Sequence, residues 1–99
     1  MEEKVLNLLH LARKAGKLKY GFDTVERSCF RGDSKLVIYA NDIAERSKKK
    51  LLDMAYAFNI KAVEFGTKEL LGKSFKMRDI GIISIDDSNF AKGIIDILR

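Results

Sequence analysis

Four stretches of the chain carry apolar residues at the three- and four-residue spacing that lines one face of an α-helix. They predict helices over residues 2–15, 22–31 and 42–58, and a last helix that Ser88 caps. The positions expected to face the core are Val5, Leu8, Leu9, Ala12, Phe22, Val25, Cys29, Leu51, Met54, Ala55, Phe58, Ala91, Ile94, Ile95 and Leu98. Gly16 and Gly32 end the first two helices, because glycine favours the left-handed conformation that commonly follows a helix.

Three shorter apolar stretches, rich in β-branched residues, predict strands over residues 35–40, 60–65 and 80–85. A short helix that Thr67 caps and Gly72 ends lies between the last two strands. Asp42 and Glu45 have the capping-box spacing for the third long helix, whereas Ser47 is suited to cap a later start. Because helices and strands alternate, we expect a single α/β domain over residues 1–99, with a sheet sandwiched between helices.

Charge is distributed unevenly along the 99 residues. The net charge is +5, residues 1–50 hold 12 basic and 7 acidic side chains, and residues 51–99 hold 7 of each. An excess of positive charge in one half favours an anionic partner such as RNA, although a basic surplus also serves solubility alone.

The side chains that most enzymes need are scarce in this sequence. His10 is the only histidine and Cys29 the only cysteine, which leaves no catalytic pair, no zinc site and no internal disulfide. Neither the dinucleotide-binding nor the P-loop glycine motif occurs. The adjacent Asp86 and Asp87 are more typical of a turn than of a magnesium site. We therefore expect no enzymatic activity, no metal and no cofactor.

Cysteine usage and hydropathy bear on the compartment. A lone cysteine fits a reducing environment, and no stretch approaches the ~18 apolar residues that span a bilayer. The N-terminus lacks the basic and then apolar pattern of a secretory signal. We expect a cytoplasmic protein that does not associate with membranes.

Basic residues gather in and after the first predicted helix. The members of this stripe share helical spacing, so they project from one face: His10, Arg13, Lys14 and Lys17. Lys19 follows, and no acidic residue occurs from residue 11 to residue 22. Such a run pairs well with phosphates, but it is equally typical of a solvated helix face.

The second predicted helix opens with the sequence Tyr20-Gly21-Phe22-Asp23-Thr24, and Arg27 lies one turn further on. A helix N-terminus preceded by glycine presents free backbone N–H groups and a positive dipole end to a phosphate or a base edge. Asp23 and Thr24 also suit simple capping of the first turn. A further basic cluster at Arg46 and residues 48–50 is more typical of a solvated face.

Four blocks spread over the full chain resemble the kink-turn RNA-binding ribosomal protein family, most closely its bacterial YlxQ-type branch. They read LLHLARKAGKLKYG, KLVIYANDIAERSKKKL, NIKAVEFGTKELLGK and IGIISIDDSNFAKGI. The resemblance implies a three-layer α-β-α sandwich with a small mixed sheet. It also implies a monomer that binds a kink-turn, which is a sharply bent internal loop in ribosomal or other structured RNA.

The resemblance also assigns roles to individual residues. The family's second helix begins Gly-x-Asn-Glu-x-x-Lys, and the matching positions here are Gly21, Asp23, Thr24 and Arg27. An ionised aspartate only accepts hydrogen bonds, so Asp23 loses the donor of the family's asparagine. By the same resemblance, Ile43 in the turn of residues 40–43 packs against RNA. In the loop before the last strand, the apolar contact falls to Met77 and a phosphate contact to Arg78.

We therefore expect one RNA-binding cradle, in which the basic segment after the first helix joins the tip of the second helix. Its members are Lys14, Lys17, Lys19, Gly21, Phe22, Asp23, Thr24, Arg27, Asn41, Asp42, Ile43, Met77 and Arg78. The changes at Asp23 and Thr24 motivate an alternative, a ribosome-associated protein–protein adaptor that kept the fold and lost specific RNA recognition.

Overall fold

The computed structural model describes residues 1–99, and its helices and strands alternate along the whole chain. In chain order they are α1 (Glu2–Lys14), β1 (Leu18–Tyr20), α2 (Phe22–Phe30), β2 (Leu36–Tyr39), α3 (Glu45–Ala57), β3 (Ala62–Glu64), α4 (Lys68–Ser74), β4 (Ile82–Ile85) and α5 (Ser88–Leu98). The four strands form one mixed sheet in the order β1-β4-β2-β3. β2 pairs parallel with β3, and β4 runs antiparallel to both β1 and β2.

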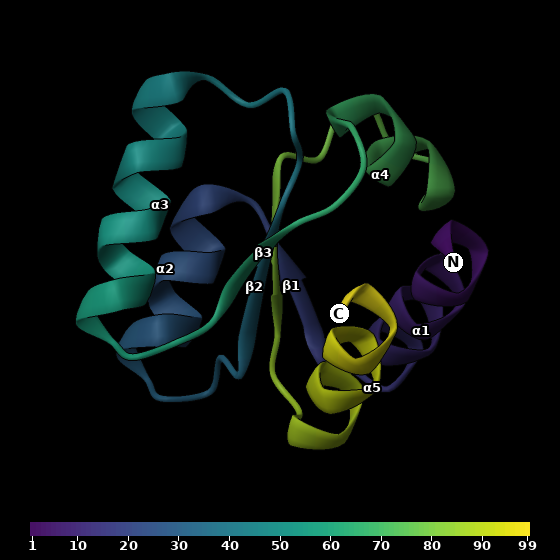
Figure 1. Ribbon diagram of the computed structural model, residues 1–99, viewed down its shortest axis with the longest axis horizontal. Helices are drawn as coiled ribbons and strands as arrows, with labels where there is room; N and C mark the ends of the chain where they lie inside the picture. Colours follow the sequence, from purple (N-terminus) through teal and green to yellow (C-terminus); the bar gives the residue numbers. More distant parts are fainter.

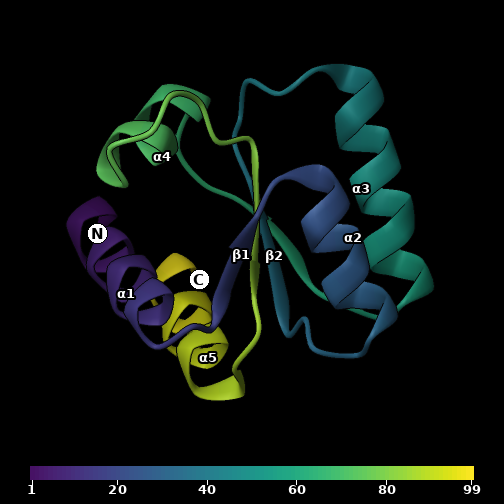
Figure 2. The same ribbon diagram turned by 180° about the vertical axis from the view of Figure 1, so that it is seen from behind.

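The sheet lies between two layers of helices (Figures 1 and 2): α2 and α3 cover one face, and α1, α4 and α5 cover the other. Alternate residues of the central strands point into different layers. Leu36 and Ile38 join the larger core cluster with α1, α4 and α5, whereas Val37 and Tyr39 join the smaller cluster with α2 and α3. The three-layer α-β-α sandwich that the sequence indicated is confirmed.

The first strand is absent from the sequence-based expectation, which named three strands. Residues 18–20 are extended because they pair with β4 in register, with Leu18 opposite Ile85 and Tyr20 opposite Ile83. Such a three-residue strand is formed by its partner rather than by local preference, since short polar–apolar segments have little intrinsic β structure. Its presence decides how the predicted site residues are arranged.

Several element ends differ from the prediction. α3 begins at Glu45 with Ala44 as its N-cap and no side-chain cap, so neither Asp42 nor Ser47 caps it. In α5, Asp87 supplies the cap through an Oδ1 that accepts the Phe90 N–H at 2.9 Å, and Ser88 is the first helical residue. Phe58, expected in the core, is 38% exposed because it follows the end of α3. Thr67 caps α4 as predicted, accepting the Leu70 N–H at 3.0 Å.

Helix length bears on membrane association. None of the five helices is both long and apolar enough to traverse a bilayer.

Candidate nucleic-acid interface

Four chain segments meet at one end of the sheet. β1, β2 and β3 run in the same direction and β4 runs against them, so the residues after the first three strands and before the fourth lie together (Figure 1). We call this region the loop end and define it as Gly21, residues 40–44, residues 65–68 and residues 78–81. The carboxyl ends of parallel strands are where α/β sheets commonly place ligand sites.

Backbone hydrogen bonds hold the four segments of the loop end to one another. The N–H of Gly21 donates to Ile82 O at 3.1 Å, and that of Ala40 donates to Gly81 O at 2.9 Å. The segment after β2 is also tied to the segment after β3, because Asn41 N–H donates to Gly66 O at 2.8 Å. Main-chain ties fix the positions of these segments while leaving their side chains available.

Asp42 links two loops through a hydrogen bond and does not cap α3. Its Oδ1 accepts the N–H of Lys68 at 2.8 Å, which joins the turn after β2 to the first turn of α4. The predicted capping box is therefore wrong, and the reason is that the chain continues for two more residues before it becomes helical. Asp42 positions the loop end, and its carboxylate is already engaged within the protein.

The N-terminus of α2 opens onto the loop end. Gly21 is its N-cap, with φ 89° and ψ 144°, and no side chain caps the helix. A residue other than glycine is strained at this φ, and the space beside the Gly21 Cα is open. The first-turn N–H groups have no partner inside the helix, so this end of α2 can receive an anion or a base edge.

A pocket of about 340 Å³, which we call the central pocket, lies between the loop end and the first half of α3. It joins three of the predicted site residues with residues that the sequence reasoning did not select. Its lining consists of Gly21, Phe22, Ile43, Ala44, Ser47, Leu51, Lys68, Gly81 and Ile82. The half-buried Phe22 and Ile43 give it an apolar floor, and Lys68 supplies a cation.

Further positive charge flanks this pocket from α3. The ammonium group of Lys50 lies 5.0 Å from the centre of the Phe22 ring, and that of Lys48 lies 5.8 Å from the Tyr39 ring. The only ion pair of the structure joins the exposed Lys49 and Asp53 at 3.4 Å. Lys48, Lys50 and Lys68 therefore have no carboxylate partner.

The segment before β4 forms a second, polar side of the loop end. Met77 is half-buried and packs against the larger core cluster, whereas Arg78 and Asp79 are exposed. These three residues border a hollow of about 590 Å³ together with Glu69 and Lys73. The segment lies tight on α4, since a Cβ added at Gly72 would lie 1.3 Å from the carbonyl oxygen of Arg78.

The structure does not bring all members of the expected cradle to the loop end. Lys17 precedes β1 and Gly21 follows it, so the extended strand separates their Cα atoms by about 13 Å. The carbonyl of Lys17 accepts the N–H of Asp86 at 2.7 Å, which places Lys17 beside the end of β4. Lys14 ends α1 at the same side. The half-buried Lys19 also turns away from the loop end, because its ammonium group donates to Gly16 O at 3.4 Å.

Three predicted residues lie along α2, from its first turn to its last. Asp23 and Arg27 are exposed and Thr24 is half-buried. Asp23 is in the first turn, where the positive end of the helix dipole favours an acidic side chain. Arg27 lies in the last turn of the helix and makes no ion pair. Asn41 is exposed in the adjacent loop.

Lys68 and Gly81 are residues that the sequence reasoning missed. Both line the central pocket, and a Cβ at Gly81 would approach Ile43 Cγ2 to 3.0 Å. Strand order could have predicted the position of Lys68, because this residue closely follows β3, which runs parallel to β2. The sequence without strand order does not show it, because these residues are 25 or more positions away from Ile43 in sequence.

At the opposite end of the sheet, the polar side chains of Ser28, Ser34, Ser84 and Asp86 form hydrogen bonds with one another. We call this region the far end. Its buried Ser84 donates to Asp86 Oδ1 at 2.6 Å and lies 2.8 Å from Ser34 Oγ, and Ser28 donates to Asp86 Oδ2 at 3.1 Å. Burial raises the pKa of the nearby Cys29 thiol, and the charges of Asp86 and Glu26 raise it further against a lowering hydrogen bond with Ser34. Cys29 is therefore a protonated, unreactive core residue at neutral pH.

The sequence matches a known protein family and is similar to several of its members. Residues 3–93 match the model of the ribosomal protein L7Ae/L30e/S12e/Gadd45 family. RNA-binding protein YlxQ of Enterococcus faecium is 31% identical over 94 residues, covering 91% of this chain and 86% of that protein. Large ribosomal subunit protein eL30 of Zea mays is 32% identical over 97 residues, covering 91% and 85%. These relatives are named as RNA-binding and ribosomal proteins rather than enzymes, in line with the non-enzymatic prediction.

Two solved structures share the fold of this chain. A protein of unknown function from Bacillus halodurans C superposes with a TM-score of 0.90 at 29% identity, over 96% of both chains. The 15.5kD RNA binding protein of Giardia lamblia superposes with a TM-score of 0.78 at 22% identity, over 97% of this chain and 82% of that one. From the family match over nearly its whole length, this chain belongs to the ribosomal protein L7Ae/L30e/S12e/Gadd45 family.

Proposed function

We propose that the protein binds RNA through the loop end and that its preferred target is a kink-turn or a similar bent internal loop. One observation carries this proposal: the uncapped N-terminus of α2 adjoins a pocket that is lined by apolar side chains and by the cation Lys68. Backbone donors, an apolar surface and unpaired cations are the three groups that recognise a distorted RNA loop.

The relatives support RNA as the partner. Two bacterial relatives bear the name RNA-binding protein YlxQ, and the one from Bacillus subtilis is 26% identical over 91 residues, covering 92% of this chain and 91% of that protein. We extend this activity to the present chain and infer that it acts in the cytoplasm, where its single thiol stays reduced.

Each part of the loop end suits a different part of a bent RNA. A phosphate or base edge approaches the open space beside Gly21, where the first-turn N–H groups of α2 point outward. A nucleobase displaced from the stack covers the exposed parts of Phe22 and Ile43. Lys50 and Lys68 then lie close enough to pair with neighbouring phosphates, which adds salt-dependent affinity.

Asp23 and Thr24 decide how specific this recognition is. Compared with the family's asparagine and glutamate, Asp23 lacks a donor and adds a negative charge, and Thr24 is shorter. A second candidate function follows from these two positions: a ribosome-associated adaptor that binds protein and has lost base recognition. The two functions differ in one measurable property, which is discrimination between bent and straight RNA.

A calorimetric titration separates the two functions. We expect the protein to bind a kink-turn duplex at least about tenfold more tightly than a straight duplex of equal length, a difference of about 1.4 kcal/mol. Equal and weak binding to both, lost between about 50 and about 200 mM salt, would leave only nonspecific charge attraction and favour the adaptor.

Replacement of Arg27 tests the position of the interface on α2. Arg27→Ala should weaken kink-turn binding by about 1–3 kcal/mol if its side chain makes a specific contact. Arg31→Ala is the matched control, since Arg31 is an exposed arginine at the C-cap of α2, one turn further from the loop end than Arg27. An equal loss in both variants would mean that only net charge matters, and no loss in either would remove α2 from the interface.

A further inference from the structure

A second basic hollow, outside the loop end, lies between α1 and the end of α4. We call it the α1–α4 cleft. It has a volume of about 850 Å³. Its lining residues are Asn7, His10, Leu11, Arg13, Lys14, Ser74, Phe75 and Lys76. Three of the eight are lysine or arginine and none is acidic, and the proposed kink-turn interface does not include this cleft.

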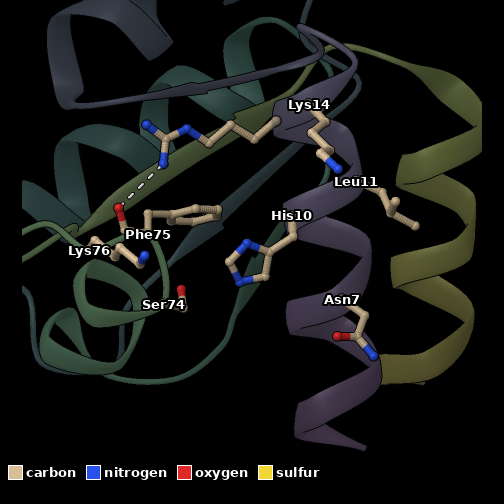
Figure 3. Close-up of a pocket in the computed structure, with 8 residues that line it drawn as sticks. Asn7, His10, Leu11, Lys14, Ser74, Phe75 and Lys76 are labelled. Atoms are coloured by element: carbon tan, nitrogen blue, oxygen red, sulfur yellow. Dashed lines mark hydrogen bonds between the residues drawn. The ribbon is translucent and has the colours of Figure 1, made fainter.

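Phe75 braces two exposed polar side chains of α1 in this cleft. Phe75 is buried, with 7% of the residue exposed, and the His10 ring lies beside the Phe75 ring with a centroid separation of 4.9 Å. The guanidinium carbon of Arg13 lies 5.1 Å from the same ring, and its Nη1 donates to Phe75 O at 3.5 Å. Figure 3 shows His10 directed from α1 toward Phe75, with Lys76 on the α4 side.

This bracing presents two planar groups to solvent in a fixed orientation. His10 and Arg13 are both exposed although each is held against Phe75. A guanidinium group that uses one N–H on a backbone carbonyl keeps further N–H donors for an anion. Planar imidazole and guanidinium groups are also surfaces on which a nucleobase stacks.

Lys76 occupies a backbone conformation that normally belongs to glycine. Its φ is 57°, because α4 ends there with the Lys76 N–H bonded to Lys73 O at 3.0 Å and the Met77 N–H bonded to Gly72 O at 2.8 Å. Glycine would adopt this left-handed position without strain. A lysine at the position therefore costs stability, and it adds a cation to the cleft that Arg13 and Lys14 also line.

We propose that the α1–α4 cleft is a second RNA-contact site, which takes one nucleotide of a single-stranded segment. The phosphate pairs with Arg13, Lys14 and Lys76, and the base stacks on His10. A nucleotide fits better than a simple anion, because an inorganic phosphate would use the cations and leave the braced planar surface unoccupied. The site goes beyond the proposed loop-end function and does not depend on a kink-turn.

Nuclear magnetic resonance tests this site directly, because His10 is the only histidine of the chain and its imidazole signals need no further assignment. The full-length protein is titrated at about 150 mM salt with a short single-stranded RNA oligonucleotide, with a mononucleotide and with inorganic phosphate, in separate experiments. We expect a saturable shift of the His10 signals with the oligonucleotide, and a weaker one with the mononucleotide. A mononucleotide that binds as tightly as the oligonucleotide would still support a nucleotide site, with free nucleotide as its ligand.

Two variants separate binding from folding. Arg13→Gln should weaken oligonucleotide binding at His10 by at least about fivefold, and Lys76→Gly should weaken it while leaving the melting temperature unchanged or raised. Lys61→Gln is the charge-matched control, since Lys61 is exposed beside β3 in the other half of the molecule. Gly21→Ala should leave the His10 shift intact, so a failure of the loop-end proposal does not affect this test.

Three results would overturn the proposal. The first is the absence of a saturable His10 shift with every ligand. The second is a shift that persists unchanged in Arg13→Gln and Lys76→Gly. The third is saturation by inorganic phosphate as tight as by the oligonucleotide, which would show that the planar surface contributes nothing.

Discussion

At the loop end, backbone groups tie the segments together and charged side chains face solvent, whereas at the far end polar side chains bond to one another. Lys68 and Lys50 have no carboxylate partner, but the hydroxyl of Ser84 is wholly buried and bonded to Asp86. No buried side-chain nitrogen or oxygen in the protein lacks a partner. Polar residues at the far end are therefore used for stability, whereas at the loop end Asp42 and Thr67 bond within the protein and the lysines have no carboxylate partner.

Removal of Asp86 should give the largest effect on folding. Asp86→Ala leaves the buried Ser28 and Ser84 without their carboxylate acceptor, so we expect the free energy of unfolding to fall by about 2–3 kcal/mol. Chemical denaturation measures it, with the exposed Asp96→Ala on α5 as the charge-matched control. Kink-turn affinity should not change, and an affinity loss would show that the far end also serves recognition.

The two glycines that flank α2 test whether the loop end, and not the far end, binds RNA. Gly21 and Gly32 have φ values of 89° and 78°, and both have open space where a Cβ would stand. Alanine at either position should cost about 1–2 kcal/mol of stability through backbone strain. Only Gly21→Ala should also weaken RNA binding in a gel-shift titration. Equal affinities for the two variants would contradict a role for the α2 N-terminus.

Asp23→Asn should move affinity and stability in opposite directions. Restoring an amide donor and removing a negative charge should tighten kink-turn binding by about 1 kcal/mol. The loss of an acidic side chain from the first turn of α2 should lower stability by about 0.3–1 kcal/mol. Asp33→Asn, an exposed change beyond the other end of α2, is the control for both measurements. An unchanged affinity would mean that this chain uses contacts of its own.

The smallest effect concerns Cys29 at the far end. Its pKa in the fold is raised above the ordinary thiol value of 9.0, so the unfolded chain releases the thiol proton first. The stability that the neutral thiol contributes is present below this ordinary value and is lost as the pH rises through the folded-state pKa. Denaturation at several alkaline pH values should therefore show a decline that is shallower in Cys29→Ala. Parallel declines would exclude a raised thiol pKa.

The sequence alone determined the fold class, because apolar periodicity and glycine positions are local properties. Four amphipathic helices, three strands and the cap at Thr67 follow from residues within a few positions of one another. The resemblance of four sequence blocks also indicated the family. Individual candidates such as Gly21 and Ile43 were found in the same way, and the structure brings them to one pocket.

Only the tertiary structure decided which of these candidates share a surface. The strand β1 exists because β4 pairs with it, and its length separates Lys17 from Gly21. Asp42 serves α4 rather than α3 because β3 brings Lys68 beside it. His10, Arg13 and Phe75 meet because α1 and α4 pack on the same face of the sheet. These contacts join residues 26 to 67 positions apart. They depend on strand order and layer packing, which no local pattern of residues encodes.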